Sequence, residues 1–231
     1  MMSGPTKMEA LSMMAQKNYD GALAVYDALL AASPYDDSLL TSKAFALVCA
    51  NRYAEALPIY DRILAFDAKK TSIYALKAHA LVKIGRPEEA IQCARWVPHL
   101  EPYDPRSYRT LAGIFATLKR VQDAVAVYDE CIQRMPQTAD AYAQKADYVM
   151  RLGHHGAAIE LLDCAIRLAP GDTTHYHNRA CVCLRAGDRQ GAVHTLYQAF
   201  QISPSARASM LKDSDFAELL ADPEARRVLG V

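Results

Sequence analysis

The sequence predicts an all-α protein built as a stack of helical hairpins, and residues that recur every 34 positions support this prediction. Alanines occupy one such series of positions, namely Ala10, Ala44, Ala78, Ala112, Ala146 and Ala180. A second alanine series comprises Ala22, Ala56, Ala90, Ala124, Ala158 and Ala192. Prolines form a third, with Pro34, Pro102, Pro136, Pro170 and Pro204, and Ala68 stands at its missing point. Because a fixed period of this length is typical of stacked repeats, we expect one supersecondary unit per period.

Within one period the pattern predicts two helices separated by a short turn. In residues 139–172, Tyr142, Ala146 and Val149 recur at helical spacing, and Gly153 then interrupts the pattern. The second apolar stripe follows and ends at Pro170, which cannot continue a helix. Since such a small helix pair cannot bury its own apolar face, neighbouring units must stack on one another.

Taken in order, six repeats fill most of the chain. Their predicted ranges are 3–36, 37–70, 71–104, 105–138, 139–172 and 173–206. The first repeat departs from the pattern, with Thr6 at the position that is Tyr142 in the fifth. In the third repeat, Pro98 falls inside the second helix, where we expect a kink or an early end.

Residues 207–231 break the repeat and predict a C-terminal cap. Apolar residues suggest one helix with a single apolar face, formed by Met210, Leu211, Phe216, Leu219 and Leu220. Asp222 and Pro223 then resemble the N-cap and first-turn residues of a last short helix. We expect these capping helices to cover the exposed end of the stack, because terminal repeats need a polar outer face.

The residue pattern resembles that of the tetratricopeptide repeat (TPR) family. In the fourth repeat the matching residues are Tyr108, Leu111, Ala112, Phe115, Ala124, Tyr128 and Pro136. The resemblance covers residues 3–206 and implies a right-handed α-solenoid in a domain spanning 1–206, followed by the capping segment 207–231. It also implies that the first helix of each repeat lines a concave groove that binds other proteins.

Composition argues against several classes of function. The chain has 26 basic and 26 acidic residues and a formal net charge of zero, which gives no general attraction for nucleic acid. Its N-terminal residues show no secretory signal pattern, and no apolar run reaches bilayer length. The six cysteines are scattered through helical patterns. We therefore expect a cytoplasmic protein with no membrane insertion and no nucleic-acid partner.

One stretch, HYHNRACVC at residues 175–183, suggests zinc-ligand spacing. The repeat explains it instead as the first helix of repeat six, in which Tyr176, Ala180 and Cys183 are packing positions. His177 and Cys181 share a helix face, but two ligands do not complete a zinc site. No phosphate-binding loop, nucleophile elbow or zinc-protease motif occurs. We therefore predict no enzyme activity, no cofactor and no metal.

The register of the implied groove gives candidate partner-binding residues. They are Phe45, His79, Lys83, Arg106, Arg109, Asp140, Asp147, Met150, His177 and Arg185. Arg106 and Arg109 are neighbours on one helix face, so together they suit a carboxylate or phosphate. The plainer alternative is that these charges solvate the groove or pair with each other, for example Arg109 with Asp140.

The leading hypothesis is a non-enzymatic scaffold or adaptor whose groove holds a peptide or helix of a partner protein. The chaperone-type carboxylate clamp known from part of the TPR family is not predicted, since Lys7 is followed by Leu11 where that clamp has an asparagine. A structural subunit that docks into a larger assembly through its outer face or its ends is the alternative. A chaperone for a hydrophobic export substrate fits six repeats poorly.

Overall fold

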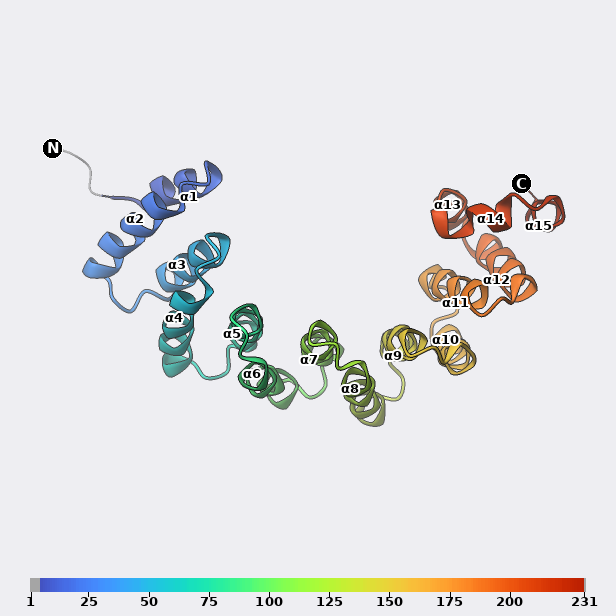
Figure 1. Ribbon diagram of the computed structural model, residues 1–231, viewed down its shortest axis with the longest axis horizontal. Coiled ribbons are helices and arrows are strands. Elements are labelled where there is room, and N and C mark those ends of the chain that lie inside the picture. Colours follow the sequence, from blue (N-terminus) through green and yellow to red (C-terminus); the bar gives the residue numbers. More distant parts are fainter. Residues whose placement is uncertain (1–4, 231) are drawn as a thin grey trace. The chain divides into compact units, whose positions relative to one another are not determined.

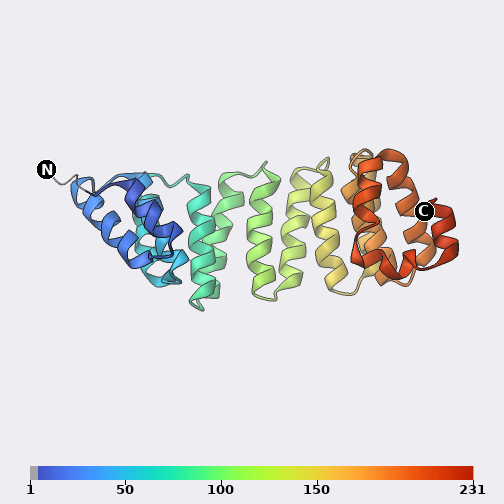
Figure 2. The same cartoon turned by 90° about the horizontal axis from the view of Figure 1, so that it is seen from above.

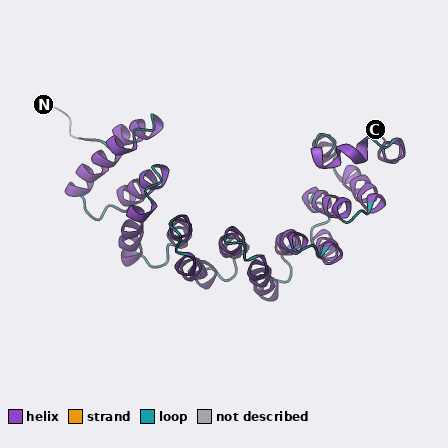
Figure 3. Ribbon diagram, viewed as in Figure 1, coloured by secondary structure: helices purple, strands orange, loops and turns teal. Residues whose placement is uncertain are grey.

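The structure, a computed structural model, describes residues 5–230 and is helical throughout, with no strand among those residues (Figure 3). The chain divides into two compact units, the first ending at Leu118 and the second beginning at Lys119. Each unit is described separately below. None of the helices between residues 5 and 230 combines the length and the apolar character needed to span a bilayer.

The first unit contains three complete helical hairpins and the first helix of a fourth repeat (Figures 1 and 2). Its helices are α1 (Lys7–Ala15), α2 (Tyr19–Ala32), α3 (Asp37–Cys49), α4 (Tyr53–Phe66), α5 (Thr71–Lys83), α6 (Pro87–Leu100) and α7 (Pro105–Thr117). Each helix contacts its neighbours in the chain. Stacking of successive hairpins therefore buries the apolar faces that a single hairpin leaves open.

The second unit continues the same pattern and ends in shorter helices. Its elements are α8 (Val121–Arg134), α9 (Ala139–Arg151), α10 (His155–Leu168), α11 (Thr173–Arg185), α12 (Arg189–Ile202), α13 (Pro204–Met210), the 3₁₀ turn η1 (Ser214–Phe216), α14 (Ala217–Leu220) and α15 (Pro223–Leu229). The second helices of all six repeats have 14 residues and end 34 residues apart. The predicted helical hairpins and their period are thus confirmed.

Small and aromatic side chains have the packing roles that the repeat predicts. All twelve alanines of the two series are at most 1% exposed, which lets helix backbones approach closely. The tyrosine series connects to the proline series: the hydroxyls of Tyr108, Tyr142 and Tyr176 donate to the carbonyls of the prolines six residues earlier, at 2.9, 3.1 and 3.2 Å. These bonds fix the start of each first helix to the end of the preceding repeat.

Ion pairs also recur with the period of 34 and join neighbouring repeats. Asp27 pairs with Lys43, Asp61 with Lys77, Asp129 with Lys145, and Asp163 with Arg179. The series is interrupted where Arg95 and Leu111 occupy the two positions, and the guanidinium of Arg95 lies instead 6.0 Å from the ring centre of Phe115. Because the pairs are partly exposed, each contributes at most about 1 kcal/mol to stability.

Two expectations for proline and the C-terminal segment were wrong. Helix α6 continues past Pro98 to Leu100, so it has no early end, because Pro98 lies in the last turn and removes only one backbone hydrogen bond. The apolar residues after Met210 form no single helix: α13 ends there, and Asp213 caps the turn η1 by accepting a hydrogen bond from the Asp215 amide. The predicted capping of the last helix is confirmed, since Asp222 accepts from the Glu224 amide and Pro223 begins α15.

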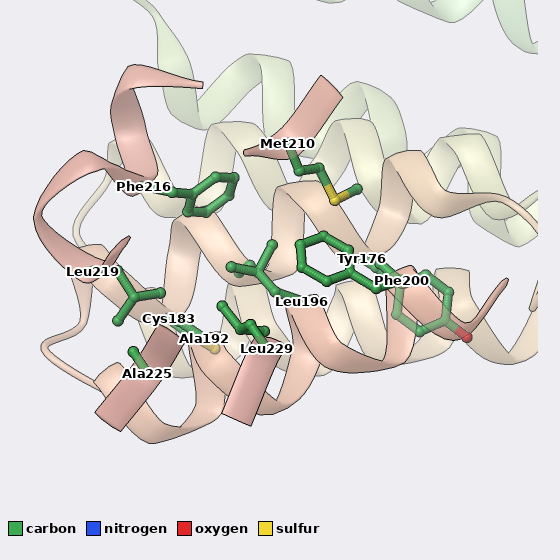
Figure 4. Close-up of a cluster of buried hydrophobic side chains, with 12 residues drawn as sticks. Tyr176, Cys183, Ala192, Leu196, Phe200, Met210, Phe216, Leu219, Ala225 and Leu229 are labelled. Carbon is green, nitrogen blue, oxygen red and sulfur yellow. The ribbon is translucent and has the colours of Figure 1, made fainter. Parts of the chain in front are cut away.

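The C-terminal helices close the second unit over a core of their own (Figure 4). Phe216, Leu219 and Leu229 are at most 3% exposed and pack with Leu196 and Cys183 from α12 and α11. Cys183 is 1% exposed, which confirms its prediction as a core residue. The segment therefore covers the apolar end of the last repeat.

Candidate functional site

The first unit contains an open apolar cavity of about 350 Å³ on its first helices. We call it the N-terminal groove, and it is lined by Leu11, Met14, Tyr26, Thr41, Ser42, Phe45, Val48, Tyr60 and Leu76. Helices α1, α3 and α5 supply its walls, while Tyr26 of α2 and Tyr60 of α4 reach it from the second helices. The groove therefore spans three consecutive repeats within one unit.

Large apolar side chains stand exposed around this groove. Phe45 is 60% exposed, Leu11 47% and Leu76 42%. The two tyrosines are 1% exposed, and burial raises the pKa of Tyr26 and raises that of Tyr60 to about 12. Their phenols are therefore uncharged at neutral pH. An apolar hollow with a few hydroxyl groups suits apolar side chains better than an anion or a metal ion.

The charged residues predicted in the first unit do not join this groove. Arg106 is 79% exposed and already bonds Asp104, with its Nε 3.0 Å from Oδ1 and its Nη2 2.9 Å from Oδ2. This guanidinium holds the pKa of the Asp104 carboxyl below its usual range. His79 is exposed with its ring edge toward Tyr53, at 6.4 Å between ring centres. Arg109 and Lys83 are exposed as well. Phe45 is thus the only predicted residue of this unit that lines the apolar groove.

In the second unit, four of the predicted residues do meet around one polar hollow of about 300 Å³. Asp147, Met150, His177 and Arg185 all line it. The Asp147 carboxylate pairs with Arg151 at 2.7 Å, and Arg185 places its Nη1 2.9 Å from the Met150 sulfur. Asp140, the remaining predicted residue, lies outside this hollow at the start of α9.

The C-terminal segment reaches into this polar hollow. His177 Nε2 lies 2.7 Å from Asp213 Oδ2, and Arg185 Nη2 lies 3.7 Å from Asp215 Oδ2. The Phe216 ring, 0% exposed, stands edge-on to His177 at 5.3 Å. Hydrogen bonds from the Asp215 amide and from His177 hold the pKa of the Asp213 carboxyl below its usual range. Two of the predicted groove residues therefore bind the chain's own cap.

Other residues of the N-terminal groove were missed by the sequence analysis, although the repeat contained the signal. Leu11 lies 34 residues before Phe45, and Met14 lies 34 residues before Val48, so both hold groove positions one repeat earlier. The first repeat was set aside because its aromatic position is Thr6. Extending the same register to that repeat would have found both.

Comparison with known proteins agrees with the repeat and the fold. Residues 7–71 match the sequence model of the tetratricopeptide repeat, and residues 44–158 match that of the N-terminal TPR region of Psidin. The chain belongs to the tetratricopeptide repeat family. No curated protein matches the sequence significantly.

Solved TPR structures resemble the chain at the level of fold. A crystal structure of the MamA protein has 20% sequence identity and a TM-score of 0.53, with 75% of this chain and 94% of that one covered. A MamA fragment from Desulfovibrio magneticus RS-1 has 16% identity and a TM-score of 0.53, covering 73% and 96%. TTC0263, a thermophilic TPR protein of Thermus thermophilus, has 18% identity and a TM-score of 0.52, covering 80% and 100%.

Proposed function

We propose that this chain is a non-enzymatic adaptor whose N-terminal groove binds an apolar segment of a partner protein, such as a short amphipathic helix. The observation that carries the proposal is the exposure of Phe45, Leu11 and Leu76 around one hollow built by three repeats. Exposed apolar surface costs solubility unless something covers it, and apolar grooves of this kind accept helix faces with anchors three or four residues apart.

The expected contribution of Phe45 follows from its exposure. An aromatic side chain buries about 150–250 Å², so the 60% that remains exposed amounts to roughly 90–150 Å². At about 25 cal/mol per Å², full coverage by a ligand contributes roughly 2–4 kcal/mol. Removal of the ring should therefore weaken binding by about 30-fold to several hundred-fold.

Phe66 offers a matched control because it is also 60% exposed but lies outside the groove, with its ring 5.3 Å from that of Tyr35. We would select ligands for the full chain from a displayed library of amphipathic helical peptides. Their affinities would then be measured by fluorescence anisotropy for the wild type, Phe45→Asp and Phe66→Asp, after circular dichroism has confirmed equal helicity. The proposal predicts a loss of affinity in Phe45→Asp alone, and equal binding by all three proteins would refute the groove as the site.

Docking through the C-terminal end is a second candidate, because a hollow of about 510 Å³ lies between α12 and α15. Its lining includes Tyr197 and Val228, which are 43% and 47% exposed. This feature supports a structural subunit that joins a larger assembly through its end. Selected peptides or partners that Tyr197→Asp/Val228→Asp abolishes and Phe45→Asp leaves unchanged would favour this second function.

A further inference from the structure

His175, on the first turn of α11, is an imidazole buried without hydrogen-bond partners. It is 2% exposed, and among the described residues neither its Nδ1 nor its Nε2 has a partner. The same repeat position is occupied by Leu39, Ile73, Ser107 and Ala141 in the four preceding repeats. Of these, Ser107 is the polar one, and its hydroxyl bonds the carbonyls of Glu101 and Asp104 at 2.9 and 2.7 Å. An unsatisfied imidazole at this buried position therefore calls for an explanation.

Two carboxylates face the Nε2 atom of this imidazole. Asp172 Oδ2 lies 3.7 Å from it and Asp140 Oδ1 lies 4.0 Å from it, and one ligand atom from each of the three residues fits within 4.8 Å of the others. Asp172 uses its other oxygen to cap α11, accepting from the Thr174 amide at 2.9 Å. That bond, ahead of the nearby imidazole, holds the pKa of the Asp172 carboxyl below its usual range, so it is ionised at neutral pH.

The separations are too long for hydrogen bonds but close to those found around a metal ion. A direct N–H···O bond needs about 2.7–3.2 Å between nitrogen and oxygen. Around a tetrahedral zinc ion with ligand distances of about 2.0–2.2 Å, neighbouring nitrogen and oxygen ligands are roughly 3.3–3.5 Å apart. Both carboxylates are on exposed residues and would need to move by less than about 1 Å, while the imidazole is held by the core.

We propose that His175 Nε2, Asp140 and Asp172 form a binding site for a divalent transition-metal ion, with water at the remaining positions. An imidazole ligand favours the zinc, cobalt and nickel class over magnesium and calcium, which prefer oxygen ligands alone. The site goes beyond the proposed adaptor function and does not depend on it. Its ligands start α9 and α11, so the ion would tie the fifth repeat to the sixth within one unit.

The test is a titration of the full chain with Zn²⁺ by isothermal calorimetry, together with thermal unfolding with and without the ion. His175→Ala introduces the residue that repeat five has at this position, and Asp140→Asn changes an exposed side chain without touching the core. Either change should lower zinc affinity at least about tenfold, since loss of even an outer partner of a metal ligand costs that much. Zinc should raise the unfolding midpoint of the wild type but not that of either variant.

Other histidines and cysteines could capture zinc by themselves, so a matched control is needed. His177→Gln/Cys181→Ser removes the nearest such pair, whose Nδ1 and Sγ atoms are 4.0 Å apart. The proposal predicts that this double variant keeps the site. Zinc binding that survives both His175→Ala and Asp140→Asn, that is lost only in the control, or that is absent from the wild type would overturn the proposal. Should His175→Ala fail to fold, Asp140→Asn alone still decides.

Discussion

The turn inside each repeat provides a direct test of how the backbone sets stability. One residue per turn has a positive φ, and these residues lie 34 positions apart: Lys17, Asn51, Gly85, Lys119, Gly153 and Gly187. For a residue with a side chain the left-handed region costs about 1–2 kcal/mol, while glycine loses about 0.5–1 kcal/mol more backbone entropy on folding. Lys119→Gly should therefore stabilise the protein by roughly 0.5–1 kcal/mol.

Urea unfolding followed by far-UV circular dichroism would measure this effect. With a slope of about 2–3 kcal/mol per M, the transition midpoint of Lys119→Gly should rise by roughly 0.2–0.5 M. Gly153→Ala is the reverse control, since φ there is 84° and an added Cβ meets nothing within 4 Å, so only the backbone changes. It should lower the midpoint by a similar amount. An unchanged or lower midpoint in Lys119→Gly, or tolerance of Gly153→Ala, would refute the argument.

Three other predictions concern charge and cysteine reactivity. Because the pKa of Asp213 is lowered in the folded state, its contribution to stability is present above the unfolded pKa, about 4, and is lost as pH falls through the folded value; Asp213→Asn should abolish that acid dependence of the C-terminal cap, as measured by hydrogen exchange of α13–α15. Burial raises the pKa of Cys131 to about 11, so in the native protein at pH 8 this thiol should react with Ellman's reagent far more slowly than the partly exposed Cys49, and equal rates would contradict the structure. Arg179 bonds Asp163 and the buried Thr195, both at 2.6 Å, so Arg179→Lys, which cannot make both bonds, should lower the free energy of unfolding by about 1–2 kcal/mol; unchanged urea unfolding would show that the second bond adds nothing.

Most of the fold could be predicted from the sequence because a repeat is local and is written many times over. Each alanine of the two series marks a close helix contact, and the structure buries every one of them. The positive φ of Lys17 and Lys119 could not be read from residue type, since lysine does not favour that conformation. Only the spacing from Gly85 and Gly153 would have shown it.

The sites were harder to predict, because exposure and partners depend on what packs nearby. Register placed Phe45 on the groove, but it could not show that Arg106 already binds Asp104 or that His177 binds Asp213 of the cap. The cap has no repeat, so its path over α11 and α12 follows from tertiary packing alone. His175 stood at a position that is apolar in most repeats, a signal of burial that the sequence analysis passed over.

The measurement that tests the central claim most directly is site-specific photo-crosslinking in the cells that produce the protein. The photoreactive residue p-benzoylphenylalanine would replace Phe45 in one sample and the equally exposed Phe66 in another, and adducts would be identified by mass spectrometry. We predict a discrete partner captured at position 45 and not at position 66, with the crosslink on an apolar segment. Adducts that are the same at both positions, or that form at position 197 but never at 45, would contradict the claim that the N-terminal groove binds the partner.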